Sequence, residues 1–250
     1  MKKQGAIGVI DIHCHVLPGL DDGATDMAET LAMLRIAADE GISDMIVTPH
    51  YRAGRFTASP EKIMETLCQV QEAADAQDIP VRLSPGNEIY WFEDMLPLLK
   101  RGGLSTLGDS SCVLIEFSPS VLFQTIHNAM DRVMGEGCQP ILAHAERYQC
   151  LLKDKENVFF LHDMGVQIQV NAATVTGKNG GEAKRFAHRL LRENIVDYIG
   201  TDAHGAKHRT PEIARCREIL LKKYGDAQTY RVMRGNAEAI LGIYDEETER

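Results

Sequence analysis

A sevenfold alternation of strand and helix patterns is the feature that most restricts the folds open to this chain. Short apolar runs alternate with amphipathic stretches of helical periodicity such as residues 27–40, without linker, repeat or low-complexity segment. The expected strands cover residues 6–13, 44–48, 81–85, 112–115, 139–143, 166–170 and 196–200. Strands separated by helical crossovers pair in parallel, so the pattern predicts one α/β domain over residues 1–250, its sheet most simply closed into a barrel. A doubly wound open sheet is the alternative.

Histidines and acids gather at the ends of these strands. Six of the seven strands finish in such residues: His13 and His15, His50, Glu88, Glu116, His144, and Asp202 with His204. With 36 acidic residues and 9 histidines among 250, random placement at so many ends is improbable. The carboxyl ends of parallel barrel strands converge on one mouth. The sequence therefore predicts one site built from scattered residues.

The composition of that site indicates metal binding. Asp11, His13 and His15 alternate along an expected strand and can project to one side, with Asp21 and Asp22 close behind. His-x-His alone is a weak signal. Adding the other strand-end imidazoles and carboxylates gives too many ligands for one tetrahedral zinc, so two or three divalent ions fit better. Such clusters are the usual device for attack on phosphorus, and a thiolate-free set of N and O ligands suits them.

The overall composition excludes several other classes. With 27 basic against 36 acidic residues, the chain is a poor match for nucleic acid or an anionic membrane as main partner. There is no apolar run of about 18 residues and no signal-peptide core, so we expect a cytoplasmic protein without membrane insertion. The six cysteines lack Cys-x-x-Cys spacing and are expected to be free thiols. None is followed by Arg six residues later, so the Cys-x5-Arg loop of thiol-based phosphatases is absent.

A set of short motifs also resembles a known superfamily. In order they are Asp-Ile-His-Cys-His, Asp-Asp-Gly, Thr-Pro-His, Gly-Asn-Glu-Ile, Ile-Glu-Phe, Ala-His-Ala-Glu-Arg and Thr-Asp-Ala-His. The set resembles the polymerase and histidinol phosphatase (PHP) superfamily. It is most similar to bacterial PHP-type protein tyrosine phosphatases of capsule and exopolysaccharide synthesis. The likeness runs from Ile10 to Leu241, and it departs from the family pattern at Ala145, where a proline is usual.

The resemblance implies a distorted (β/α)7 TIM-like barrel of the PHP type with three metal sites. The ligands it implies for the first metal are His13, His15, Glu88 and Asp202. Glu88 would bridge to a second metal that also takes Glu116 and His144, and the third would take Asp22, His50 and His204. Manganese is the typical occupant, with iron, zinc or magnesium as alternatives. Asp11 is expected to orient a histidine, and Asp21 to be a solvated loop acid.

Arginines supply the remaining catalytic candidates. Arg147 and Arg209 match family arginines that grip phosphate, and a guanidinium fits two phosphoryl oxygens. With Asp202 and His204 they form the expected catalytic set. Arg52 and Arg55 follow His50, where a substrate contact and a solvated loop are both open. The aromatic residues 90–92 fit beside a phosphotyrosine ring or in the core equally well, while Gln169 and Asn171 are expected to line the barrel.

The expected activity is therefore metal-dependent hydrolysis of protein phosphotyrosine. A metal-bridging hydroxide would attack phosphorus in line, without a phosphocysteine. The protein substrate would be a bacterial tyrosine kinase or another exopolysaccharide-synthesis protein. Alternatives are a small-molecule phosphomonoesterase of the histidinol-phosphate type, a phosphodiesterase, or a non-catalytic metal-binding partner of a tyrosine kinase. The oligomeric state stays open.

Overall fold

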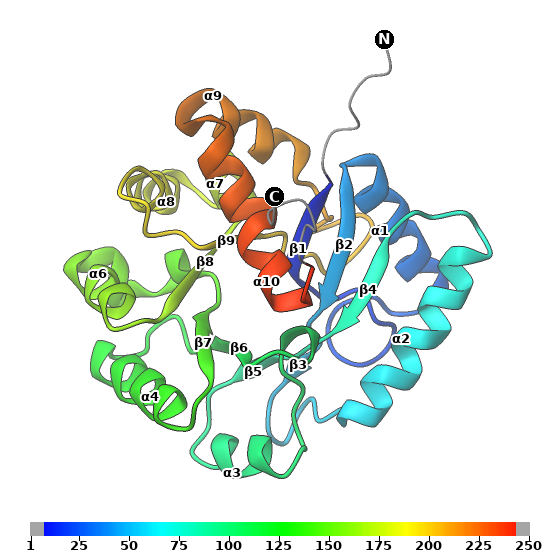
Figure 1. The fold of residues 1–250 in the computed structure, drawn as a ribbon, viewed down its shortest axis with the longest axis horizontal. Coiled ribbons are helices and arrows are strands. Elements are labelled where there is room, and N and C mark those ends of the chain that lie inside the picture. The colour runs from blue at the N-terminus through cyan, green and yellow to red at the C-terminus, as the bar shows by residue number, and fades with distance from the viewer. Residues whose placement is uncertain (1–7, 244–250) are drawn as a thin grey trace, which may run out of the picture.

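A curled wall of parallel strands forms the centre of the molecule, and helices surround it (Figure 1). The computed structural model describes residues 8–243. One sheet has the order β1 (Val9–Cys14), β2 (Ile42–Val47), β4 (Arg82–Pro85). The other has the order β3 (His50–Tyr51), β5 (Glu88–Tyr90), β6 (Cys112–Glu116), β7 (Gln139–Leu142), β8 (Gln167–Asn171), β9 (Tyr198–Gly200). All the pairings between these strands are parallel, as the sequence predicts.

The ring closes between its first and last strands. The Asp202 amide donates to the His13 carbonyl and the His15 amide donates to the Ala203 carbonyl, both at 2.8 Å. Cys14 and Ala203 form an isolated parallel bridge at the same place. The expected barrel is thereby confirmed over the described residues, and the open doubly wound sheet is not what forms.

Two of the expected strands are broken and continue as short second segments. β2 resumes as β3 and β4 resumes as β5, with His50 paired to Glu88 across the resumed pair. Pro49, in the first break, has no N–H for a ladder. Gly86 lies in the second break, where a Cβ would stand 2.8 Å from Leu107 and 3.0 Å from Ile46. These breaks carry His50 and Glu88 over the barrel mouth.

The outer layer is helical, and its starts follow local capping chemistry. α1 (Met27–Asp39) begins at Asp26, whose side chain accepts from the Glu29 amide at 2.9 Å. α2 (Pro60–Asp75) begins at Ser59 with proline in its first turn, as predicted. The other helices of this layer are α3 (Met95–Lys100), α4 (Phe123–Gly135), α5 (Gln149–Lys153), α6 (Glu156–Asp163), α7 (Ala172–Thr176), α8 (Gly181–Arg192) and α9 (Ala214–Tyr230). Between residues 8 and 243 no helix combines the length and apolarity needed to cross a membrane.

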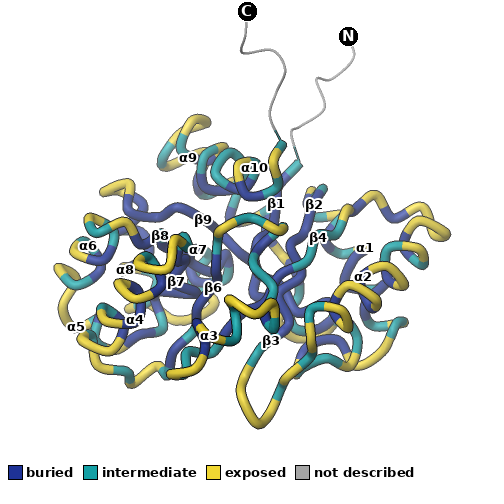
Figure 2. Tube along the Cα trace, turned by 60° about the horizontal axis from the view of Figure 1, so that its bottom comes forward, coloured by how far each residue is buried: buried dark blue, intermediate teal, exposed yellow. Residues whose placement is uncertain are grey.

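The amino-terminal end of the barrel is plugged by the last helix. A buried cluster joins Ile10, Ile141 and Tyr198 of the strands to Leu107 and to Ile240 of α10 (Asn236–Leu241). The red helix lies across the strands in Figure 1, and β1 and β9 are dark blue, hence buried, in Figure 2. Packing at this end leaves the carboxyl ends of the strands as the open mouth.

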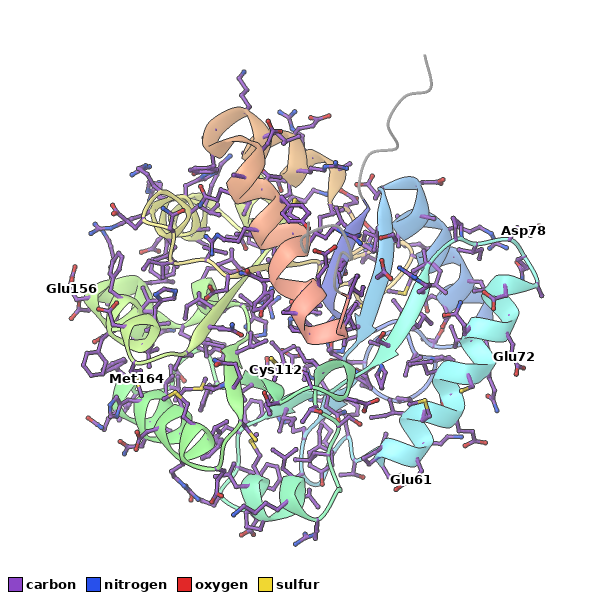
Figure 3. All side chains as sticks on the ribbon, viewed as in Figure 1. Glu61, Glu72, Asp78, Cys112, Glu156 and Met164 are labelled. Atoms are coloured by element: carbon purple, nitrogen blue, oxygen red, sulfur yellow. The ribbon has the colours of Figure 1, made fainter. Side chains whose placement is uncertain are left out.

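Acidic side chains of the outer layer point away from this centre. Figure 3 shows Glu61, Glu72, Asp78 and Glu156 projecting from the periphery, and all four are exposed. Part of the net charge of −9 is thus carried on the outside of the helical layer.

Candidate active site

The barrel mouth holds every histidine and acid that the sequence predicts for the site. Apart from His144, their ligand atoms form three groups, each with all members within 4.8 Å of one another. The groups are His13, His15, Glu88 and Asp202; His15, Asp22, His50 and His204; and His50, Glu88 and Glu116. Because His15, His50 and Glu88 each occur in two groups, the three candidate positions adjoin.

Glu88 lies at the centre of these groups and is fully buried. Its Oε2 is 3.2 Å from Nε2 of both His13 and His15, and 3.0 Å from Nδ1 of His50. Despite these neighbours Oε2 makes no hydrogen bond to any described residue. Buried polar atoms are normally satisfied, so an orphaned carboxylate oxygen facing imidazole nitrogens fits a site for divalent cations.

His144 lies beside the groups without joining one. Its Nε2 is 2.9 Å from Glu88 Oε1 and 3.5 Å from Glu116 Oε1, which is where the resemblance places it. In the third group His50 stands in its place. Asp22 is the most exposed of the candidate acids at 48%, and its Oδ1 is 3.5 Å from His50 and 3.7 Å from His204.

Asp21 is not the solvated loop acid that we expected. Its side chain is fully buried, with Oδ2 2.6 Å from His15 Nδ1 and 2.8 Å from the His50 amide that donates to it. Burial opposes its ionisation, but His15 outweighs burial and lowers the pKa of Asp21 to about 2. A carboxylate behind a candidate ligand fixes its tautomer and ring orientation. The loop after Leu17 folds Asp21 back under the site, which the sequence alone does not reveal.

Asp11 bonds two backbone amides and a threonine hydroxyl, and not the imidazole ring that we expected it to orient. Its carboxylate accepts hydrogen bonds from the His13 amide and from the amide and hydroxyl of Thr201. The two bonds from Thr201 tie β1 to the residue that follows β9. Burial raises the pKa of Asp11 to about 6 in spite of them.

A chain of side-chain amides connects three candidate ligands. Gln169 Oε1 accepts from the His144 amide at 2.6 Å and lies 3.2 Å from His13 Nδ1. Gln169 donates to Asn171, and Asn171 donates to Asp202, both at 2.8 Å. The expected barrel-lining role of the two amides therefore includes positioning of the ligands.

Glu146 is a buried supporting residue that the sequence analysis missed. Its Oε1 accepts from the Asn171 amide at 3.0 Å and from the Thr174 hydroxyl at 2.7 Å. Its place inside the Ala-His-Ala-Glu-Arg motif was the available signal.

Two arginines meet on Asp202 at the mouth. Nη2 of Arg147 is 2.5 Å from Asp202 Oδ2, and Nη2 of Arg209 is 2.6 Å from Oδ1. Their side chains are 34% and 45% exposed, so each guanidinium keeps donors toward solvent. Burial raises the pKa of Asp202, but His13 and Arg147 hold it well below its usual range. The arrangement offers an anion two guanidinium groups beside the candidate metal positions.

The comparison with protein families agrees with this geometry. Residues 9–242 match the family described as capsular polysaccharide synthesis, CpsB/CapC. The chain belongs to the CpsB/CapC family.

Characterised members share most of their length with this CpsB/CapC chain. Tyrosine-protein phosphatase YwqE of Bacillus subtilis is 30% identical over 233 residues, covering 93% of this chain and 91% of that protein. Tyrosine-protein phosphatase CpsB of Streptococcus pneumoniae is 32% identical over 238 residues, covering 93% and 98%. A crystal structure from work on YwqE and CpsB as metal-dependent tyrosine phosphatases superposes with a TM-score of 0.88 at 30% identity, covering 94% of this chain and 95% of the other.

Aromatic residues near the mouth divide into packing and lining residues. Trp91 stacks on Phe117 and Phe92 on Tyr51, while Tyr90 lies under the guanidinium of Arg52. Phe56, which the sequence analysis did not single out, lines the mouth instead, in a cavity of about 190 Å³ over the site. Its ring is nearly parallel to that of His50, with centroids 6.0 Å apart. Arg52 and Arg55 line the same cavity, and both are exposed.

Three residues of this mouth have left-handed backbone conformations. The φ angles are 33° at His144, 54° at Asp202 and 50° at Arg209. Such angles are uncommon outside glycine and cost free energy, which surrounding structure must offset. At His144 the hydrogen bond from its amide to Gln169 supplies such support.

Metal uptake by this CpsB/CapC chain is expected to strengthen as pH rises. Burial opposes protonation of His15 and His144, yet the facing acids Asp21, Glu116 and Glu88 outweigh it and raise their pKa values to about 10 and about 9. Both imidazoles are thus protonated at pH 7 without metal, whereas a ligand must give up its proton. Apparent affinity should gain up to about tenfold per pH unit for each displaced proton, and level off near pH 10.

Titration calorimetry of the metal-free protein with Mn²⁺, in two buffers of different ionisation enthalpy, measures the protons released. Release at pH 7 that declines toward pH 10 is the expected result. Metal binding without proton release at pH 7 would contradict it.

Proposed function

We propose that this CpsB/CapC protein is a metal-dependent phosphatase that hydrolyses phosphotyrosine in proteins. The observation that carries the proposal is the pair of guanidinium groups held on Asp202 beside three adjoining groups of metal-ligating atoms. The names of YwqE and CpsB as tyrosine-protein phosphatases support the substrate class. A tyrosine kinase of capsule or exopolysaccharide synthesis is the protein substrate that we propose.

The metal ligands that we propose are the nine residues of the mouth. Two or three divalent ions would be held by His13, His15, Asp22, His50, Glu88, Glu116, His144, Asp202 and His204. Their nitrogen and oxygen donors suit manganese, which we expect, or iron, zinc or magnesium. When bound, such ions stabilise negative charge on a phosphoryl group and make water nucleophilic at neutral pH.

The chain itself contributes binding and orientation. Arg147 and Arg209 lie where their free N–H groups can donate to two phosphoryl oxygens, and Asp202 sets their separation. His204 stays unprotonated, because burial and the neighbouring His15 lower its pKa to about 3. Its imidazole is therefore free to act as a ligand at neutral pH.

A cysteine nucleophile has no support in this site. Cys14 lies between the two ligand histidines in sequence, but its side chain is fully buried in the apolar core and donates weakly to the Ile46 carbonyl at 3.5 Å. Burial and the charge of Asp11 raise the pKa of the Cys14 thiol well above its ordinary value. The thiolate, which is the reactive form, is thus suppressed.

We propose that the entrance favours a tyrosyl ring over a compact alkyl group. Phe56 supplies an aromatic wall to the cavity of about 190 Å³ over the site. Aromatic rings pair favourably in offset or edge-to-face arrangements, so this wall suits the ring of a phosphotyrosine. Arg52 and Arg55, which line the same cavity, are exposed and thus accessible to an approaching polypeptide.

Chelation is expected to abolish turnover of a phosphotyrosine peptide, and added Mn²⁺ to restore it, while thiol alkylation leaves the rate unchanged. The assay measures phosphate release together with the metal content of the protein. Histidinol phosphate, a phosphoserine peptide and a phosphodiester are tested as alternative substrates, and their rates are compared with that of the phosphotyrosine peptide. Turnover that survives exhaustive metal removal would refute the mechanism. A faster reaction with histidinol phosphate or the diester would favour those rivals, and an inactive, metal-replete protein would favour a non-catalytic module.

A further inference from the structure

A second, larger cavity opens directly beside the metal site. It has a volume of about 740 Å³ and shares Arg147, Asp202 and Arg209 with the mouth. From there it extends over the loop that follows β9 to the start of α9, and to the end of α7. A substrate whose phosphoryl group contacts the two arginines has this cavity as its neighbour.

The cavity is basic although the chain is acidic. Its cationic lining residues are Arg147, Lys178, Lys207, Arg209 and Arg215, whereas its acids are only Asp202 and Glu212. Arg147 and Arg209 pair with Asp202, and Lys178 pairs with Glu212. Lys207 and Arg215 are therefore the cationic lining residues that have no acidic partner among the lining residues. In a protein with a net charge of −9, a local excess of positive charge beside the site selects for anionic groups.

The loop that carries Lys207 is held in place by hydrogen bonds within the chain. The His204 amide donates to the Arg209 carbonyl at 2.9 Å, closing the loop at its base. The Ala206 amide donates to Glu29 of α1 at 3.4 Å, and a Cβ at Gly205 would stand 3.1 Å from the same carboxylate. On the far wall, Arg215 rises from the first turn of α9 and pairs with Glu218 at 2.6 Å.

We infer that this basic cavity receives carboxylate side chains of the substrate segment next to the phosphotyrosine. Lys207 and Arg215 are exposed and come from two different segments, the loop after β9 and the first turn of α9. Two such cations suit carboxylates spaced along a chain better than one compact anion. The inference rests on the proposed phosphotyrosine phosphatase activity and adds a sequence preference to it. Lys207 and Arg215 then determine specificity without taking part in the chemical step.

The test compares two phosphotyrosine peptides that differ only in glutamates or glutamines around the tyrosine, with p-nitrophenyl phosphate as a substrate that has no flanking chain. The wild-type protein should prefer the glutamate peptide. The double variant Lys207→Ala/Arg215→Ala should lose about fivefold in kcat/KM on that peptide, mainly through KM, since exposed ion pairs contribute modestly. Its rates on the glutamine peptide and on p-nitrophenyl phosphate should stay within about twofold.

A matched control removes the same charge elsewhere. Lys155→Ala/Lys222→Ala changes two exposed lysines that do not line the cavity, one of them on α9, and should keep the peptide preference. An equal loss on both peptides and on p-nitrophenyl phosphate, or a preference that persists in Lys207→Ala/Arg215→Ala, would overturn the inference. If the wild-type protein hydrolyses both peptides equally, the inferred role of the cavity is wrong but the proposed function stands. If it hydrolyses neither peptide, the proposed function is wrong as well.

Discussion

Replacing Glu88 by alanine is expected to deplete the bound metal and to lower phosphotyrosine turnover by about a thousandfold or more, since metal stabilisation of the transition state supplies several kcal/mol. Glu88 has this weight because one buried carboxylate faces His13, His15, His50 and His144 within 3.2 Å. Metal analysis of the purified variant together with phosphate release provides the measurement. Intact metal content with full activity would contradict the assignment of Glu88.

Glu88→Gln is the control that separates lost ligation from lost folding. Removing one partner of a buried ionic cluster costs about 3–5 kcal/mol, so the alanine variant is also expected to melt earlier. Glutamine keeps the volume and one oxygen but removes the negative charge. A well-folded Glu88→Gln protein with depleted metal and low turnover is the expected outcome, and thermal denaturation of both metal-free variants checks it.

Arg147→Ala is expected to lower kcat by about 100- to 1000-fold while the protein keeps its metal, as for loss of one preorganised donor to a transition-state oxygen. Arg147 is the less exposed of the two arginines, and its Nη2 is 2.5 Å from Asp202. Arg209→Ala should lower kcat less, because the Arg209 side chain is more exposed than that of Arg147. Steady-state kinetics on a phosphotyrosine peptide, with metal analysis of each variant, measures both effects.

Guanidinium rescue tests whether the arginine acts directly on the phosphoryl group. Added guanidinium should restore part of the turnover of Arg147→Ala, and Arg147→Lys should recover less than expected from charge alone, because an ammonium lacks the planar pair of donors. Loss of metal from Arg147→Ala, without rescue, would instead indicate that Arg147 supports Asp202 as a ligand.

Much of the fold was open to prediction because apolar periodicity and turn residues agree along the chain. The strand expected at 139–143 is β7 (Gln139–Leu142), and Ser59 with Pro60 starts α2 as its pattern indicates. The segments β3 and β5 are two and three residues long. They form because β3 pairs with β5 and β5 pairs with β6, so no local sequence pattern predicts them.

The candidate site was predictable to the extent that strand ends determine it. His144 and Asp202 could be grouped without coordinates, since parallel strands bring their ends together. The position of Asp21 depends on how a loop folds back, and that of Phe56 on which rim it occupies. Neither position can be predicted from the residues next to Asp21 or Phe56 in the sequence. The basic cavity joins charges from the turn after α7, from α9 and from the loop between β9 and α9, so it emerges only from the packing of separate elements.

Because the barrel closes between β1 and β9, the candidate site combines residues that are synthesised at the start and near the end of the chain. His13 and His15 leave the ribosome early, whereas Asp202 and His204 follow nearly two hundred residues later. β1 also packs against α10, so one face of the strand is covered only after Ile240 has been synthesised. A nascent chain cannot complete the first group of candidate ligands until Asp202, which follows β9, has emerged. We therefore expect metal to bind at this group only after that segment has been synthesised.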